Sequence, residues 1–176
     1  MAEPEFDDPI EWVGHFWRKQ HLGDPRKFMA LGSLLRLHQV VTDEVERVLK
    51  PFGLTRTGYL VLATVQLSPN GRRLLSRIAT HMLVHQTTVT LVVEKLEAQG
   101  LLRRAAHPTD RRATYAQITP AGSALMKDAT RALEKVGFGM RRLTNAQAGE
   151  LLEVLNPIRA AAGDIGRQSQ GNSRTG

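Results

Sequence analysis

The order of secondary-structure signals between residues 76 and 118 is the feature that most restricts the fold of this chain. Ser76 can cap a short helix with apolar residues at 78, 79 and 82, and a tight turn at 84–86 follows. A second helix, over 86–99, has a buried stripe formed by Val89, Val92, Val93 and Leu96. The segment therefore predicts two helices joined by a tight turn.

Two short strands are predicted directly after this pair of helices. Gly100 supplies a left-handed end for the second helix, and strands are expected over 102–106 and 114–118. The residues between them, 107–113, form a polar hairpin loop. Together these elements predict a mainly α fold with a small β-hairpin wing, which is a winged helix-turn-helix domain.

A long amphipathic helix precedes this domain. Asp24 and Pro25 form a helix start, with aspartate as the cap and proline at the first helical position, and Pro51 and Gly53 end the helix. The stripe recurs at threes and fours: Phe28, Leu31, Leu34, Leu35, His38, Val41, Val45, Val48 and Leu49. Because a helix of about 25 residues is longer than a small domain requires, we expect it to pack against a copy of itself.

Three further helices have clear start signals. Thr55 caps one helix, Thr119 caps another before a proline, and residues 144–147 form a capping box for the last one. Pro157 lies inside the last helix and is expected to kink or split it. A short extended piece is expected at 73–75. The residues expected to face inward in the helix after Thr55 are Tyr59, Leu60, Ala63 and Leu67.

These signals divide the chain into four parts. Residues 1–23 form an N-terminal amphipathic extension, residues 24–54 and 120–165 a helical dimerisation region, and residues 55–119 the winged helix-turn-helix DNA-binding domain. Residues 166–176 are polar and rich in Gly and Ser, so a disordered tail is expected there.

The helix over 86–99 carries polar residues on the side that faces away from its apolar stripe. The formal net charge of +7 favours a polyanionic partner. Glutamine can bind adenine with two hydrogen bonds, and threonine can bond bases or contact the thymine methyl group in the major groove. We therefore predict contacts with double-stranded DNA from Gln86, Thr87, Thr88, Thr90, Leu91 and Lys95, and from Ser76 on the preceding helix.

The wing loop carries the second group of candidate DNA contacts. Arg111 and Arg112 lie at its tip, and Arg103 and Arg104 flank it on the incoming strand. An arginine on a narrow loop can enter the minor groove, where the negative potential is enhanced. Asp110 is expected to brace the loop by pairing with an arginine or by capping the turn. Arg103, Asp110, Arg111 and Arg112 complete the predicted DNA-binding set.

The segment from His107 to Gly122 resembles the signature of the MarR family, an Asp-x-Arg wing followed by a hydrophobic-Thr-x-x-Gly helix start. The similarity covers roughly residues 28–160, although Leu83 stands where the family often has glycine. The resemblance implies an obligate homodimer with interwound first and last helices and one winged domain on each DNA half-site. It also implies that Arg112 is the minor-groove arginine.

The same resemblance implies a repressor that a small-molecule effector, phenolic or otherwise aromatic, releases from a palindromic operator. The effector pocket is expected between the dimer stem and the DNA-binding domain. Trp17, His38 and Tyr59 are candidate ligand-binding residues because each places a polar group on an otherwise apolar segment.

Other functional classes have weaker support. His81 and His85 have a metal-ligand spacing, but the predicted turn falls between them, so a metal-responsive regulator stays an alternative, as does a non-specific architectural DNA-binding protein. No catalytic motif, cofactor motif or metal site is evident, and the chain has no cysteine, so an enzyme is not expected. With no membrane-spanning stretch and no basic signal-peptide start, a cytoplasmic location is expected.

Overall fold

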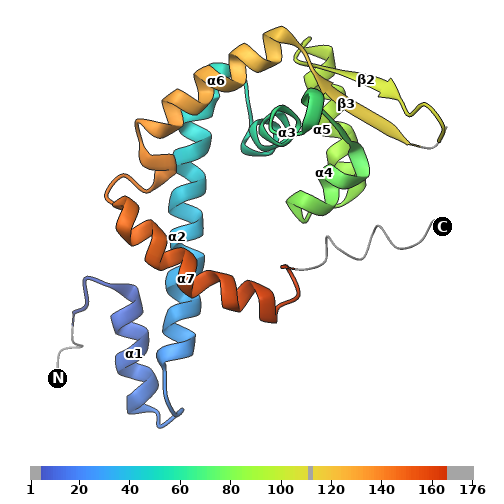
Figure 1. The fold of residues 1–176 in the computed structure, drawn as a ribbon. Coiled ribbons are helices and arrows are strands. Elements are labelled where there is room, and N and C mark those ends of the chain that lie inside the picture. Colours follow the sequence, from blue (N-terminus) through green and yellow to red (C-terminus); the bar gives the residue numbers. More distant parts are fainter. Residues whose placement is uncertain (1–4, 111–112, 166–176) are drawn as a thin grey trace.

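The computed structural model describes residues 5–110 and 113–165 (Figure 1). Its helices are α1 (Pro9–Lys19), α2 (Arg26–Leu49), α3 (Arg56–Gln66), α4 (Leu75–Met82), α5 (Gln86–Ala98), α6 (Pro120–Glu134) and α7 (Asn145–Ala161), and its strands are β1 (Arg72–Leu74), β2 (Leu102–Ala106) and β3 (Thr114–Ile118). No helix of the described ranges combines the length and apolar character needed to cross a membrane. The expected disordered tail, 166–176, lies outside the described residues.

The hydrophobic core lies in the half of the molecule that contains the sheet. The sheet and α3, α4, α5 and α6 enclose it, and Leu49 at the end of α2 is also fully buried. The largest fully buried side chains are Leu49, Leu62, Ile78, Leu102, Leu133, Val61, Val65, Val89 and Val93. Burial of each contributes about 1.5–3 kcal/mol relative to exposure, so this cluster fixes α5 and the hairpin relative to one another.

The hairpin has the bounds expected from the sequence, and it belongs to a larger sheet. The strand order is β1-β3-β2, with both neighbouring pairs antiparallel. Leu102 pairs with Ile118 at one end of the hairpin and Ala106 pairs with Thr114 at the other. The extended piece expected at 73–75 lies one residue earlier, and its pairing with β3 was not predicted because it depends on residues far along the chain.

The inward face of α3 differs from the expected one. Leu60 is 40% exposed and Leu67 is 83% exposed, whereas Val61, Leu62 and Val65 are fully buried. Tyr59 is buried as expected. Residues 59–63 of this helix are all apolar, so helical spacing alone allowed two phases. The packing of α3 against α5 and α6 selects the phase that includes Val61, Leu62 and Val65.

Two expectations about helix ends, and the expectation that Pro157 splits α7, also need correction. Helix α4 begins at Leu75 without a side-chain cap, because β1 pairs with β3 up to Leu74 and the helix follows at once. Ser76 is therefore an exposed first-turn residue and not the cap. Pro157 does not split α7, which continues to Ala161. Helix α2 begins one residue later than expected, although the Asp24 carboxylate still accepts the Arg26 N–H at 3.0 Å.

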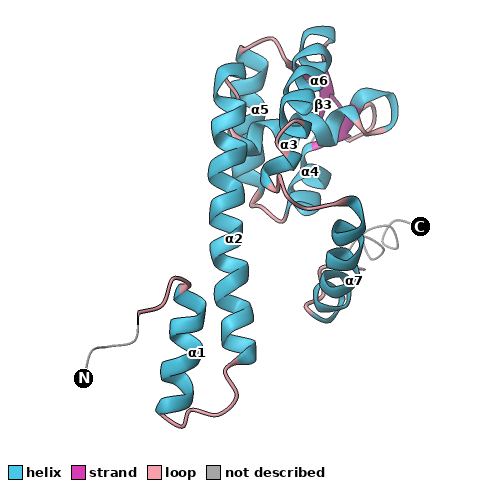
Figure 2. Cartoon of the chain, turned by 90° about the vertical axis from the view of Figure 1, so that its left-hand side faces the viewer, coloured by secondary structure: helices cyan, strands magenta, loops and turns pink. Residues whose placement is uncertain are grey.

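Helices α1 and α2 form an arm that extends beyond the core (Figure 2). Helix α1 packs on one side of α2, where Trp17 stacks on Phe28 with ring centroids 4.7 Å apart. Other apolar side chains of α2 remain exposed in the single chain: Leu31 is 51%, Leu34 52% and Leu35 60% exposed. The part of the apolar stripe formed by Leu31, Leu34 and Leu35 is therefore about half exposed in the single chain.

Leu83 holds a left-handed backbone conformation between α4 and α5, with φ 52° and ψ 39°. A residue with a Cβ loses about 1–2 kcal/mol in this conformation, and glycine does not. The Leu83 side chain is 65% exposed and adds little packing. We expect Leu83→Gly to raise the free energy of unfolding by about 1 kcal/mol in a urea titration.

Leu67 provides the matched control for this substitution. It is more exposed than Leu83 and ends α3 with an ordinary φ of −77°. Leu67→Gly is expected to destabilise the chain by about 0.5–1 kcal/mol, because glycine only adds backbone freedom there. If both substitutions destabilise the chain equally, Leu83 is not strained.

Candidate nucleic-acid interface

A tight turn joins α4 to α5 and sets the direction of α5. The Val84 N–H donates to the Ala79 carbonyl at 3.1 Å, across the left-handed Leu83. His85 then caps α5: its Nδ1 accepts the Thr87 N–H at 3.3 Å and lies 3.0 Å from the Thr87 hydroxyl. Sequence reasoning missed this cap because histidine is not among the usual N-cap residues.

The two faces of α5 are divided as the sequence predicts. Val89, Val93 and Leu96 are buried, and Val92 is partly buried. Four polar candidates and one apolar candidate are exposed on the remaining surface: Gln86, Thr87, Thr88, Leu91 and Lys95. Thr90 is half-buried, and its hydroxyl donates to the Gln86 carbonyl at 3.1 Å. The helix therefore presents a mostly polar surface that its own core does not use.

Leu91 is an exposed apolar residue within this polar surface. Its side chain is 62% exposed, although an aliphatic residue of α5 would ordinarily face the core. The predicted contact between Leu91 and the C5-methyl group of a thymine needs such an exposed side chain, and the contact itself stays a prediction. A leucine packed against the base of the wing would be covered, so the exposure of Leu91 argues against such a packing role.

Arg104 ties the hairpin to α5 and is not available as a free wing cation. Its guanidinium pairs with Glu97 at 2.7 Å and with Glu94 at 3.1 Å, and its backbone N–H donates to Glu97 at 2.8 Å. The Arg104 N–H, followed by its guanidinium, lowers the pKa of Glu97 below the ordinary value of 4.5. Arg103 remains exposed, and its Nε donates to the neutral Gln117 Oε1 at 3.2 Å.

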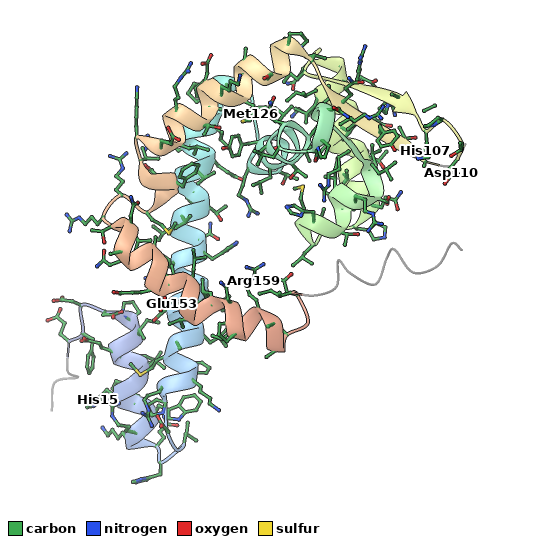
Figure 3. The ribbon with its side chains drawn as sticks, in the orientation of Figure 1. His15, His107, Asp110, Met126, Glu153 and Arg159 are labelled. Atoms are coloured by element: carbon green, nitrogen blue, oxygen red, sulfur yellow. The ribbon has the colours of Figure 1, made fainter. Side chains whose placement is uncertain are left out.

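His107 organises the start of the wing loop, at the outer end of the hairpin (Figure 3). Its Nδ1 accepts the Asp110 N–H at 3.1 Å and the Thr109 N–H at 3.3 Å, while its ring stacks on Tyr115 with centroids 5.2 Å apart. The Ala113 N–H closes the loop on the Asp110 carbonyl at 3.0 Å. Arg111 and Arg112 lie outside the described residues, so bracing of their side chains by Asp110 stays a prediction.

The three candidate ligand residues lie on different elements. Trp17 stacks on Phe28 in the arm, and its indole N–H donates to the Leu22 carbonyl at 3.0 Å. His38 is exposed on α2. Tyr59 is buried, and its hydroxyl lies 2.9 Å from the Thr130 hydroxyl of α6. Within one chain these residues do not form a single lining.

The two histidines with metal-ligand spacing belong to separate helices. His81 lies in the last turn of α4 and His85 is the cap of α5, with the left-handed Leu83 between them. Among the residues that the structure describes, no group of three or more His, Cys, Asp or Glu side chains is arranged to hold a metal ion.

Comparison with known proteins connects this geometry to one family. The model of the MarR family matches residues 54–114, which span α3 to the start of β3. The chain is 33% identical over 128 residues to the HTH-type transcriptional repressor IacR of Pseudomonas putida, a match covering 71% of this chain and 74% of IacR. It is 38% identical over 95 residues to the HTH-type transcriptional regulator MhqR of Bacillus subtilis, covering 54% of this chain and 64% of MhqR, slightly under two thirds.

A solved structure gives the same result for the fold. Sco5413, a MarR family transcriptional regulator from Streptomyces coelicolor, is 34% identical and superposes with a TM-score of 0.73. The match covers 80% of this chain and 97% of Sco5413, so it includes regions on both sides of the winged domain.

Proposed function

The chain belongs to the MarR family of winged helix-turn-helix transcriptional regulators, and from this premise we propose that it is a repressor that binds a palindromic operator as a homodimer. Helix α5 reads bases in the major groove, and the wing contacts the adjacent minor groove. A small aromatic effector weakens this binding. The observation that carries the proposal is the outward face of α5.

The face of α5 supports base reading because its position is fixed and its side chains are free of the core. Val89, Val93 and Leu96 anchor one side of the helix, and the Arg104 ion pairs hold the hairpin against it. Helix and wing therefore approach a duplex as one rigid unit, which a specific complex requires. Gln86 lies at the N-terminal end of the helix, the part that contacts base edges in helix-turn-helix proteins.

Gln86→Ala is expected to weaken binding to the best operator by about 1–3 kcal/mol, because a glutamine that bonds a base carries sequence information. Binding to random duplex DNA should change little, because charge supplies most of that affinity. Both affinities can be measured by fluorescence anisotropy at one salt concentration. Gln99→Ala, at the other end of the same helix, is the matched control and should leave both unchanged.

The same experiment separates a repressor from a non-specific architectural protein. Equal loss of operator and random-DNA affinity in Gln86→Ala, or an operator bound no better than random DNA by the unsubstituted chain, would contradict sequence-specific reading.

A homodimer is supported by the apolar surface that one chain leaves uncovered. On α2 this surface includes Leu31, Leu34 and Leu35, and on α7 it includes Leu152, Val154 and Ile158, which are 54%, 62% and 61% exposed. No residue of α7 is buried within the single chain. Exposed apolar surface on this scale marks an interaction site, and pairing of the first and last helices with those of a second copy covers it.

The wing supplies the remaining contacts in this proposal. Arg112 enters the minor groove, Arg111 contacts the backbone and Asp110 braces the loop, as the family resemblance implies. The described part of the loop supports a rigid wing, because His107 fixes the amides of Thr109 and Asp110. A rigid loop loses less conformational freedom when it inserts an arginine.

The effector site is proposed between the stem and the winged domain. Tyr59 supports this location, because its hydroxyl lies against Thr130 of α6 where the two regions meet. A phenolic or other aromatic ligand can bind more tightly when the two winged domains of the dimer are at a spacing that does not fit the operator. It then weakens DNA binding by the difference between its affinities for the two arrangements.

A further inference from the structure

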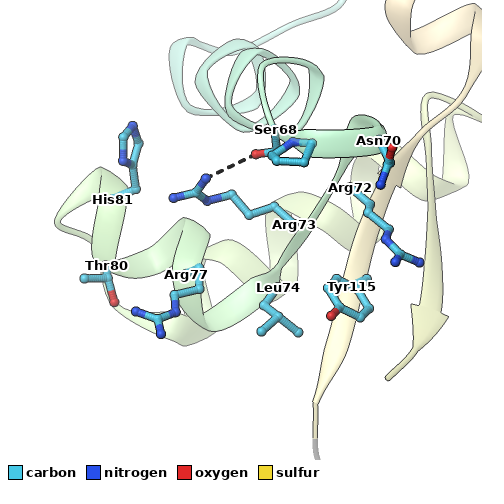
Figure 4. A pocket seen from close by; sticks show the side chains of 10 residues that line it. Ser68, Asn70, Arg72, Arg73, Leu74, Arg77, Thr80, His81 and Tyr115 are labelled. Carbon is cyan, nitrogen blue, oxygen red and sulfur yellow. Dashed lines mark hydrogen bonds between the residues drawn. The ribbon is translucent and has the colours of Figure 1, made fainter. Parts of the chain in front are cut away.

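A cationic hollow of about 650 Å³ lies on the winged domain, between α4 and the edge of the sheet (Figure 4). Three arginines line it, Arg72 and Arg73 from β1 and Arg77 from α4. Leu74 and Tyr115 contribute apolar surface. No acidic side chain is part of this lining, so every formal charge in it is positive.

Arg73 carries a hydrogen-bond donor that its own chain does not satisfy. Its Nη1 donates to the Ser68 hydroxyl at 3.2 Å, but its Nε is shielded from solvent and has no hydrogen-bond partner. A buried donor without an acceptor costs about 1–3 kcal/mol, and more when the group is charged. This cost is released when the Arg73 side chain turns outward and its Nε donates to an anion in the hollow.

The three arginines also lack the neutralising partners found elsewhere in the molecule. Arg26, Arg47 and Arg104 each pair with a carboxylate. No ion pair joins Arg72, Arg73 or Arg77 to a carboxylate in the described ranges, and the Arg72 guanidinium instead lies over the Tyr115 ring, 5.1 Å from its centroid. Figure 4 shows the Arg72 guanidinium turned away from those of Arg73 and Arg77. Like charges that line one hollow without a counter-charge create a field that favours an anion.

We propose that this hollow is a binding site for the phosphate group of a small phosphorylated ligand. Arginine binds phosphate with paired, charge-assisted hydrogen bonds. Arg73 and Arg77, which lie on the same side of the hollow in Figure 4, can each offer such bonds to a group with two or more negative charges. A duplex backbone carries the same phosphate chemistry, and a titration with DNA distinguishes the two sources. The site is separate from the outward face of α5 and from the proposed effector site at Tyr59.

Isothermal titration calorimetry of the full chain without DNA tests the proposal, with pyrophosphate as the probe at constant ionic strength. We expect saturable binding of one pyrophosphate per chain. Arg73→Gln and Arg77→Gln should each weaken it about tenfold or more, because each removes a charge-assisted contact. The control is Arg26→Gln, which removes the same charge from a highly exposed residue at the start of α2 and should leave the affinity unchanged.

Two variants are used because a substitution at Arg73, which lies in a paired strand, can disturb the sheet. Arg77 is not among the buried residues of α4, so its substitution should leave the fold intact. No saturable binding, or equal affinity in Arg77→Gln and Arg26→Gln, overturns the proposal.

A titration of duplex DNA against salt forms the second arm. If Arg77→Gln binds pyrophosphate normally but lowers the salt slope by about one, the arginine holds a DNA phosphate and the small-ligand site is wrong. Because the calorimetry contains no DNA, its failure leaves the proposed repressor function untouched.

Discussion

Leu31→Glu is expected to abolish the homodimer and, with it, operator binding. Leu31 lies within the apolar stripe of α2 and is 51% exposed in the single chain. A second copy that covers this stripe would bury the new carboxylate in an apolar interface, which costs several kcal/mol. Glutamate is a good helix former, so α2 itself should persist.

Sedimentation velocity should show loss of the dimer, and affinity for the operator should fall by about 10³-fold or more, toward the level of non-specific binding. Gln39→Glu adds the same charge to the same helix outside the stripe, where Gln39 donates to Asp43 at 2.7 Å. This control should stay dimeric and bind operator with little change. A dimeric Leu31→Glu with normal operator affinity would show that α2 is not the interface.

Gly122→Ala is expected to be among the most destabilising single substitutions in the chain. A Cβ at Gly122 would lie 2.0 Å from the Leu101 carbonyl oxygen. This oxygen belongs to the backbone, so the clash cannot be relieved by rotating a side chain. The same carbonyl accepts the Thr119 N–H and the Thr119 hydroxyl, both at 3.1 Å. The start of α6 must therefore move away from the hairpin, and these bonds are lost.

We expect Gly122→Ala to lower the free energy of unfolding by about 3 kcal/mol, the upper part of the range for overpacking. Urea denaturation measures the loss. Gly149→Ala is the matched control, since no atom lies within 4 Å of the added Cβ, and replacing a glycine inside α7 should stabilise the chain by about 0.5–1 kcal/mol. Similar effects of the two substitutions would contradict the close approach of α6 to Leu101.

Local signals in the sequence were sufficient for the parts of the fold that depend on neighbours along the chain. Gly100 ends α5 with a φ of 72°, and Thr119 and Thr144 cap α6 and α7 through the hydrogen bonds that their side-chain types predict. The hairpin has the expected bounds, because Gly100 ends the helix before it and a polar loop separates its two strands.

Features that depend on distant residues were not predictable in this way. The pairing of β1 with β3 and the phase of α3 are decided by packing partners that lie far apart in the sequence. Arg104 has the same residue type and strand as Arg103, and only the fold places it beside Glu94 and Glu97.

The exposed face of α5 was predicted more completely than the hydrogen bonds that hold α5 and the wing loop in place. Periodicity alone places Gln86, Thr87 and Lys95 outside the core, because the buried stripe of α5 leaves no other side for them. The caps formed by His85 and His107 were missed for two reasons. The Nδ1 of a histidine accepts a hydrogen bond only in the tautomer that is protonated at Nε2, and neither position has a distinctive sequence pattern.

The spacing of the two half-sites tests the central claim, that two copies of this chain read DNA together, most directly. An operator can be selected from a random duplex library with the purified chain and then lengthened between its half-sites by about 5 bp, half a helical turn. A two-fold dimer with fixed α5 helices should bind the selected operator with half-site centres about 34–36 Å apart and lose that affinity after the insertion. Unchanged affinity for the lengthened operator would contradict the account, because each winged domain would then bind DNA independently.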